Sequence, residues 1–186
     1  MDGVEHGRLL DLGPAFQSTI NFFIERGFRV TTDDLLRDWK EFLDSQEERL
    51  RKQAAGDPDD ELTPAALAES FLDESFSYPS ESFHAVLAWD LFDYLDSDLM
   101  KRVVDRIHKL LWPGGAVLAT FHSRPPDSFC RYRLADNQSI ELVPTPSPFT
   151  HKRVFQNREM MNLFSQFRSS KTFVGRDQLR EGLFLK

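Results

Sequence analysis

Two nearly continuous apolar segments, residues 83–89 and 116–121, constrain the fold more than any other feature of the sequence. Such runs are typical of strands that are buried on both faces of a sheet. The chain between them places Leu99, Val103 and Ile107 on one helical face and ends in a Pro-Gly-Gly breaker. A strand, a helix and a strand in this order predict a parallel β-α-β unit, because parallel strands need a long crossover connection.

The same alternation of strand and helix patterns continues along the rest of the chain. Further strands are predicted at residues 8–12, 28–32 and 139–143, with a terminal hairpin at 171–175 and 182–185. Helices are predicted at 15–26, 35–54, 64–71, 97–111 and 157–167, and a loop at 124–137. This order predicts an α/β fold, with a Rossmann-like, doubly wound, mostly parallel sheet, helices on both faces and an antiparallel C-terminal strand.

One acidic segment interrupts these patterns. Residues 44–62 are rich in charge and contain the breaker sequence Gly56-Asp57-Pro58. We expect residues 1–186 to form a single domain that carries a mobile insertion at about residues 44–62.

Composition excludes several classes of protein. The net charge of -7 disfavours nucleic-acid binding, and no apolar run approaches the roughly 20 residues that span a bilayer. The N-terminus lacks a basic and then apolar signal segment, and Cys130 is the single cysteine. The five histidines lack metal-ligand spacing, so the sequence predicts no metal site. These features predict a cytoplasmic protein that binds neither membrane nor nucleic acid.

Three segments carry a resemblance to a known family. Residues 82–89, Ser-Phe-His-Ala-Val-Leu-Ala-Trp, are similar to the fourth strand of the class I S-adenosylmethionine-dependent methyltransferases. Residues 110–118, with Pro113-Gly114-Gly115, resemble the entry to that family's fifth strand, and Asp11-Leu12-Gly13 resembles its first loop. The resemblance covers nearly the whole chain. It implies a methyltransferase that uses S-adenosylmethionine as cofactor and acts on an unidentified acceptor.

The first loop also departs from the family pattern. Ala15 and Gln17 stand where the family has its second and third glycines, which allow close backbone approach to the ligand. The bulky Phe16 and Gln17 could fill space meant for the methionine moiety. An alternative is therefore a catalytically inactive, methyltransferase-like binding or scaffold protein. A third alternative is a nucleotide-binding domain, although this loop suits a pyrophosphate poorly.

The resemblance also implies which residues contact the cofactor. They lie in four places: the first loop, the end of the second strand, the segment before residue 83, and the end of the following strand. The residues are Asp11, Gly13 and Pro14; Asp33 and Asp34; Leu72 and Asp73; and Ala88 and Trp89. Of the two acids, Asp34 matches the family spacing better as the ribose ligand, although an Asp there could simply cap a helix. Asp90 and His122 are the candidate catalytic bases, and either could instead be structural.

Overall fold

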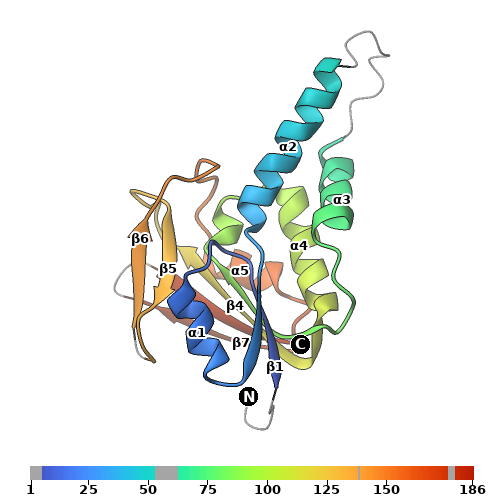
Figure 1. Ribbon diagram of the computed structural model, residues 1–186. Coiled ribbons are helices and arrows are strands. Elements are labelled where there is room, and N and C mark those ends of the chain that lie inside the picture. The colour runs from blue at the N-terminus through green and yellow to red at the C-terminus, as the bar shows by residue number, and fades with distance from the viewer. Residues whose placement is uncertain (1–5, 53–62, 138, 176–178) are drawn as a thin grey trace.

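The computed structural model describes residues 6–52, 63–137, 139–175 and 179–186 (Figure 1). The first half contains β1 (Gly7–Asp11), α1 (Gln17–Ile24), β2 (Phe28–Thr32), α2 (Leu35–Lys52), α3 (Pro64–Ser75), β3 (Phe83–Trp89) and the 3-10 helix η2 (Leu91–Asp93). The second half contains α4 (Ser97–Leu110), β4 (Leu111–His122), β5 (Cys130–Leu134), β6 (Ile140–Pro144), α5 (Asn157–Leu163), β7 (Ser169–Val174) and β8 (Leu179–Leu185). None of the described helices is long and apolar enough to cross a bilayer.

Six strands form the main sheet in the order β2-β1-β3-β4-β8-β7. The pairs β1–β2, β1–β3 and β3–β4 are parallel, whereas β8 runs antiparallel to both β4 and β7. The predicted fold class, including the antiparallel C-terminal strand, is confirmed. The chain places β2 on one side of β1 and β3 on the other. The carboxyl ends of β1 and β3 therefore flank a topological switch point, where folds of this kind bind ligands.

Helices cover both faces of the sheet, but unequally. Alternation along the strands sends Leu10 and Val86 toward a large core that is shared with α2, α3, α4 and α5. Leu9 and Leu87 face the other side, where α1 and the β5–β6 hairpin cover them. The second face is thus closed partly by a hairpin, and this hairpin reaches the switch point.

The β5–β6 hairpin corrects one prediction and confirms another. The predicted loop at 124–137 contains β5, and the strand predicted at 139–143 is β6, which pairs with β5 in a separate two-stranded sheet. The short segment Cys-Arg-Tyr-Arg-Leu does alternate, as a strand should. The two arginines of this segment suggested an exposed loop. In the structure, however, Arg131 and Arg133 lie over the Phe16 ring and bond to neighbouring groups.

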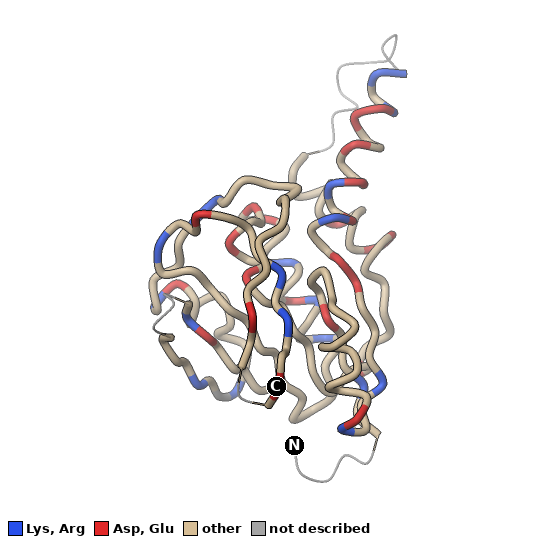
Figure 2. The backbone as a smooth tube through the Cα atoms, turned by 60° about the vertical axis from the view of Figure 1, so that its left-hand side comes forward, with Lys and Arg blue, Asp and Glu red and all other residues tan. Residues whose placement is uncertain are grey.

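The expected insertion is partly helical. Residues 44–52 continue α2, which projects away from the sheet (Figure 1). Acidic and basic side chains are interleaved along it (Figure 2), and ion pairs such as Arg51–Glu47 at 2.6 Å and Lys52–Glu48 at 2.8 Å link successive turns. Residues 44–52 thus belong to the helix predicted at 35–54, and residues 53–62 lie outside the described part of the chain.

Candidate functional site

The loops that follow β1, β2 and β3 enclose two neighbouring cavities. The wide cavity has a volume of about 470 Å³ and is lined by residues that include Gly13, Pro14, Asp33, Asp34 and Arg131. The narrow cavity has only about 10 Å³ and lies between the first loop, the end of β3 and the hairpin. Gly13, Pro14 and Asp34 line both. Residues from separate parts of the sequence thus meet at the switch point, as parallel strands require.

Carboxylates dominate the wide cavity. The hydroxyl of Tyr78 donates a hydrogen bond of 3.1 Å to Asp33 Oδ2. The backbone N–H of Arg37 donates to Asp34 Oδ1 at 3.4 Å, so Asp34 caps the start of α2 while it also lines the cavity. Asp38 lies on the same wall. Three acids facing one space suit a ligand that donates hydrogen bonds, such as the hydroxyls of a ribose.

Burial changes the ionisation of these acids. Burial and the adjacent Asp38 together raise the pKa of Asp33 to about 7, while the hydrogen bond from Tyr78 opposes the shift. Burial also raises the pKa of Asp34. The Asp33 carboxyl group is therefore protonated in part of the protein molecules at neutral pH.

We expect Asp33→Asn to stabilise the protein above neutral pH. The folded-state pKa of about 7 exceeds the unfolded value of about 4, so between these values the folded chain keeps a proton that the unfolded chain has lost. The free energy of unfolding of the parent chain therefore falls as pH rises through this window. Asparagine cannot ionise. The variant should match the parent near pH 4 and exceed it by about 1 kcal/mol at pH 8, a value reduced for solvent screening.

Urea unfolding at both pH values measures this difference. The matched control is Asp44→Asn, at an exposed position on α2 whose side chain is 56% accessible. The control should show no gain that depends on pH. Equal stability of Asp33→Asn and the parent at pH 8 would show that the cavity does not desolvate Asp33.

Trp89 fills the space beside the first loop. Its indole Nε1 donates a buried hydrogen bond of 2.7 Å to Asp11 Oδ1, and the backbone N–H of Gly13 donates to the same oxygen at 3.1 Å. A Cβ atom on Gly13 would lie 2.6 Å from Cδ1 of the indole. Trp89 itself has a positive φ of 31°, which is costly for an aromatic residue. Gly13 is thus required by the close approach of the protein's own tryptophan.

The hairpin holds Trp89 in this place. The Tyr132 ring stacks on the indole, with centroids 5.0 Å apart and planes 10° from parallel. Arg131 donates from Nε to the carbonyl of Pro14 at 3.0 Å and from Nη2 to that of Ala15 at 2.7 Å. The hairpin is therefore bonded to the loop that carries the glycine motif. The remaining narrow cavity is about the size of one water molecule.

The two cavities differ in whether they can hold the part of the implied cofactor that is expected in each. The wide cavity offers volume and hydrogen-bond acceptors for the adenosine part of S-adenosylmethionine. The resemblance places the methionine part near Ala88 and Trp89, where the narrow cavity has no room for it. The residues present fit the nucleoside and do not fit the amino-acid moiety.

Two further predicted positions lie elsewhere. Leu72 is buried in the large core, and Asp73 forms a 2.7 Å ion pair with Arg106 on α4; neither residue lines the two cavities. Between β2 and β3 the described chain has α2 and α3 but no strand, so the segment before β3 runs past α4. Nor do the loop residues fill the narrow cavity: Phe16 lies against Arg131, and Gln17 bonds to Asn21 at 2.8 Å.

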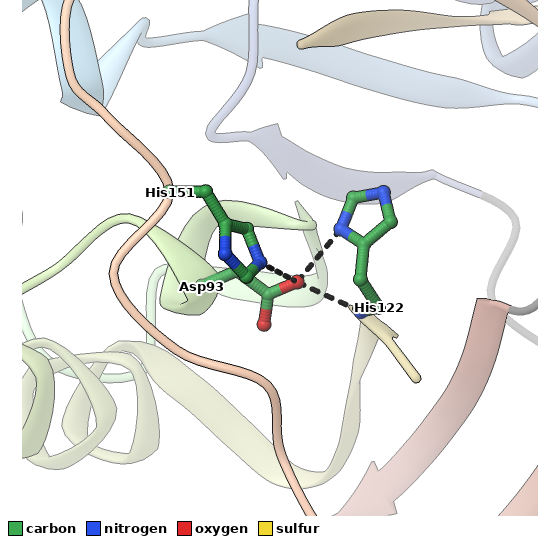
Figure 3. A group of neighbouring side chains, drawn as sticks. All are labelled: Asp93, His122 and His151. Atoms are coloured by element: carbon green, nitrogen blue, oxygen red, sulfur yellow. Dashed lines mark hydrogen bonds and ion pairs between the residues drawn. The ribbon is translucent and has the colours of Figure 1, made fainter. Parts of the chain in front are cut away.

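Both candidate bases belong to a buried polar cluster, which Figure 3 shows in part. His122 Nδ1 lies 2.8 Å from Asp93 Oδ2 and 3.9 Å from Asp90 Oδ2. His151 Nε2 lies 3.9 Å from Asp93 Oδ2. Burial raises the pKa of Asp90 to about 7, raises that of Asp93, and lowers that of His151. Sequence reasoning missed Asp93 and His151, because each lies 29 residues from His122 and no local motif joins them.

No protein-family model and no curated protein matches this sequence. Solved structures do match it. One is the Burkholderia thailandensis 1,6-didemethyltoxoflavin-N1-methyltransferase with bound 1,6-didemethyltoxoflavin and S-adenosylhomocysteine, at 18% identity and a TM-score of 0.54 over 98% of this chain and 72% of that one. Another is an S-adenosylmethionine-dependent methyltransferase from Mesorhizobium loti, at 16% identity and a TM-score of 0.52 over 98% of this chain and 92% of that one.

A third similar structure, an S-adenosylmethionine-dependent methyltransferase from Methanosarcina mazei, aligns at 16% identity and a TM-score of 0.50 over 97% of this chain and 91% of that one. At these identities the likeness is one of fold. The chain therefore has the class I methyltransferase fold, as its motifs indicated, and its activity must be argued from the site.

Proposed function

We propose that this chain is a methyltransferase-like protein that binds an adenosine-type nucleoside in the wide cavity and does not transfer a methyl group. The observation that carries the proposal is the position of Trp89, whose indole lies on Gly13 and bonds to Asp11. The first loop keeps the acid and the first glycine of the cofactor motif. Asp11 accepts the hydrogen bond from the Trp89 indole, and Gly13 leaves the space that the indole fills.

The nucleoside half of the proposal rests on the wide cavity. Asp33 and Asp34 follow β2, where folds of this kind place the acid that accepts hydrogen bonds from ribose hydroxyls. Ile20 supplies an apolar wall, and Arg37 and Arg131 partly balance the acids. A neutral ligand rich in hydroxyl groups suits this lining better than a phosphate, which the three carboxylates would repel.

Calorimetric titration with adenosine tests the nucleoside half. The parent chain should bind adenosine, and Asp34→Ser should bind it at least about tenfold more weakly, a loss of about 1.4 kcal/mol. Serine keeps a helix cap while removing the carboxylate. Asp44→Ser, on the exposed part of α2, is the matched control and should bind like the parent. The proposal fails if the folded parent gives no binding, or if Asp34→Ser binds as well as the parent.

A second candidate is an active S-adenosylmethionine-dependent methyltransferase with an unidentified acceptor. The similar structures are methyltransferases, and a further cavity of about 180 Å³, lined by His122 and Cys130, could receive an acceptor. This candidate requires Trp89 and Tyr132 to leave the narrow cavity. For this second candidate we also propose a cytoplasmic location and an acceptor that is not a nucleic acid. Tight binding of S-adenosylhomocysteine by the unaltered chain would favour it.

A further inference from the structure

Two imidazoles and a carboxylate converge on one point at the carboxyl end of β4. Asp93 ends η2, His122 ends β4, and His151 lies in the segment before α5. One potential ligand atom from each residue lies within 4.8 Å of the other two. Figure 3 shows the imidazoles of His122 and His151 on either side of the Asp93 carboxylate.

We propose that Asp93, His122 and His151 form a binding site for a divalent transition-metal ion, with Zn²⁺ as the ion that suits it best. The ligand atoms are a carboxylate oxygen of Asp93, Nδ1 of His122 and Nε2 of His151. Zinc binds nitrogen and oxygen at about 2.0–2.2 Å, which separates tetrahedral ligands by about 3.3–3.5 Å. The observed separations of 2.8 Å and 3.9 Å from Asp93 Oδ2 bracket that value.

Unsatisfied polar atoms surround this point. Asp93 Oδ1, Asp90 Oδ2 and His151 Nε2 are buried and have no hydrogen-bond partner among the described residues. Buried polar atoms are nearly always paired, and a buried carboxylate without a counter-charge is costly. The hydrogen bond between Asp93 and His122 accounts for one oxygen and one nitrogen but leaves these three atoms without partners. A cation held by the Asp93 carboxylate would satisfy the orphaned His151 Nε2 directly and would offset the negative charges of Asp93 and Asp90.

The backbone already holds the three residues in position. The N–H groups of Lys152 and Arg153 donate to the Asp93 carbonyl at 2.9 Å and 3.3 Å, which ties the His151 segment to η2. The Tyr94 ring packs edge-on against the His151 imidazole at 5.6 Å. Such supporting contacts orient ligands before a metal binds.

The site would face a cavity. His122 also lines the 180 Å³ space beside Cys130 and Arg124, while Asp93 is fully buried. Three protein ligands with space on one side resemble the arrangement that leaves a coordination position open to a small molecule. This inference does not depend on the nucleoside proposal, because the two sites share no residue.

Titration of the untagged 186-residue chain with Zn²⁺, after dialysis against a chelator, tests the site. We expect the parent to bind one ion, and His151→Gln to bind it at least about 100-fold more weakly. His6→Gln, which removes an exposed histidine, should bind like the parent. Circular dichroism establishes that each variant is folded. Co²⁺ provides a second measurement, since ligation by imidazole gives a visible absorption spectrum that His151→Gln should lose.

Two results would overturn the proposal. One is the absence of Zn²⁺ binding by the folded parent chain. The other is binding by His151→Gln with the affinity of the parent, which would place the ion elsewhere. The His151 side chain is 15% accessible and lies outside the helices and strands, so its replacement is compatible with folding.

Discussion

Replacement of Trp89 by alanine is expected to lower the free energy of unfolding by about 3–5 kcal/mol and to admit S-adenosylhomocysteine. Trp89 is 5% exposed, stacks on Tyr132 and donates its indole N–H to Asp11. Its removal leaves a space beside the first loop, where the resemblance places the methionine moiety. The affinity for S-adenosylhomocysteine should therefore rise at least about tenfold.

Urea unfolding and calorimetric titration measure the two effects. Trp112→Ala is the matched control, because Trp112 is 45% exposed and should cost less than about 1 kcal/mol without any change in binding. The stability effect would be contradicted by a loss similar to that of the control. The binding effect would be contradicted if folded Trp89→Ala bound the ligand no better than the parent.

Replacement of Asp11 by alanine is expected to lower the free energy of unfolding by about 2–4 kcal/mol. Asp11 is 1% exposed, and its Oδ1 accepts hydrogen bonds from both Trp89 and Gly13. Alanine leaves these two buried donors without a partner. Part of the loss is offset, because burial of the carboxylate is itself unfavourable and raises its pKa to about 6. Asp11→Asn keeps an acceptor oxygen and should cost about half as much.

Thermal and urea unfolding at pH 7 compare these variants. Asp73→Ala is the control, since Asp73 forms a surface ion pair with Arg106 and its side chain is 62% accessible. The control should change stability by less than about 1 kcal/mol. If Asp11→Ala were as stable as the control, Asp11 would be available for a ligand rather than engaged in holding Trp89.

The sheet could be predicted because its signal is carried by long apolar segments. Residues 83–89 are buried along nearly their whole length, so periodicity alone marks a central strand. Strand β5 could not be predicted, because its burial depends on partners distant in sequence, such as Trp89, on which the Tyr132 ring stacks. The helix predicted at 35–54 also includes residues 44–52, where ion pairs link successive turns of charged residues.

The location of the crevice could be predicted from the sequence, but its filling by Trp89 could not. Parallel strands bring their carboxyl ends together, so Gly13, Asp34 and Trp89 could be assigned to one crevice from sequence alone. Whether Trp89 borders that crevice or fills it depends on a positive φ and on contacts from the hairpin. Asp93 and His151 meet His122 only through tertiary packing of η2 and the segment before α5.

The most direct test of the account compares adenosine with S-adenosylhomocysteine as ligands of the unaltered chain. If Trp89 and Tyr132 fill the methionine position, the amino-acid moiety adds no contacts, and adenosine should bind at least as tightly as S-adenosylhomocysteine. Titration calorimetry gives both dissociation constants under the same conditions. Tighter binding of S-adenosylhomocysteine by about tenfold or more would contradict the account, because the methionine position would then be open to ligand.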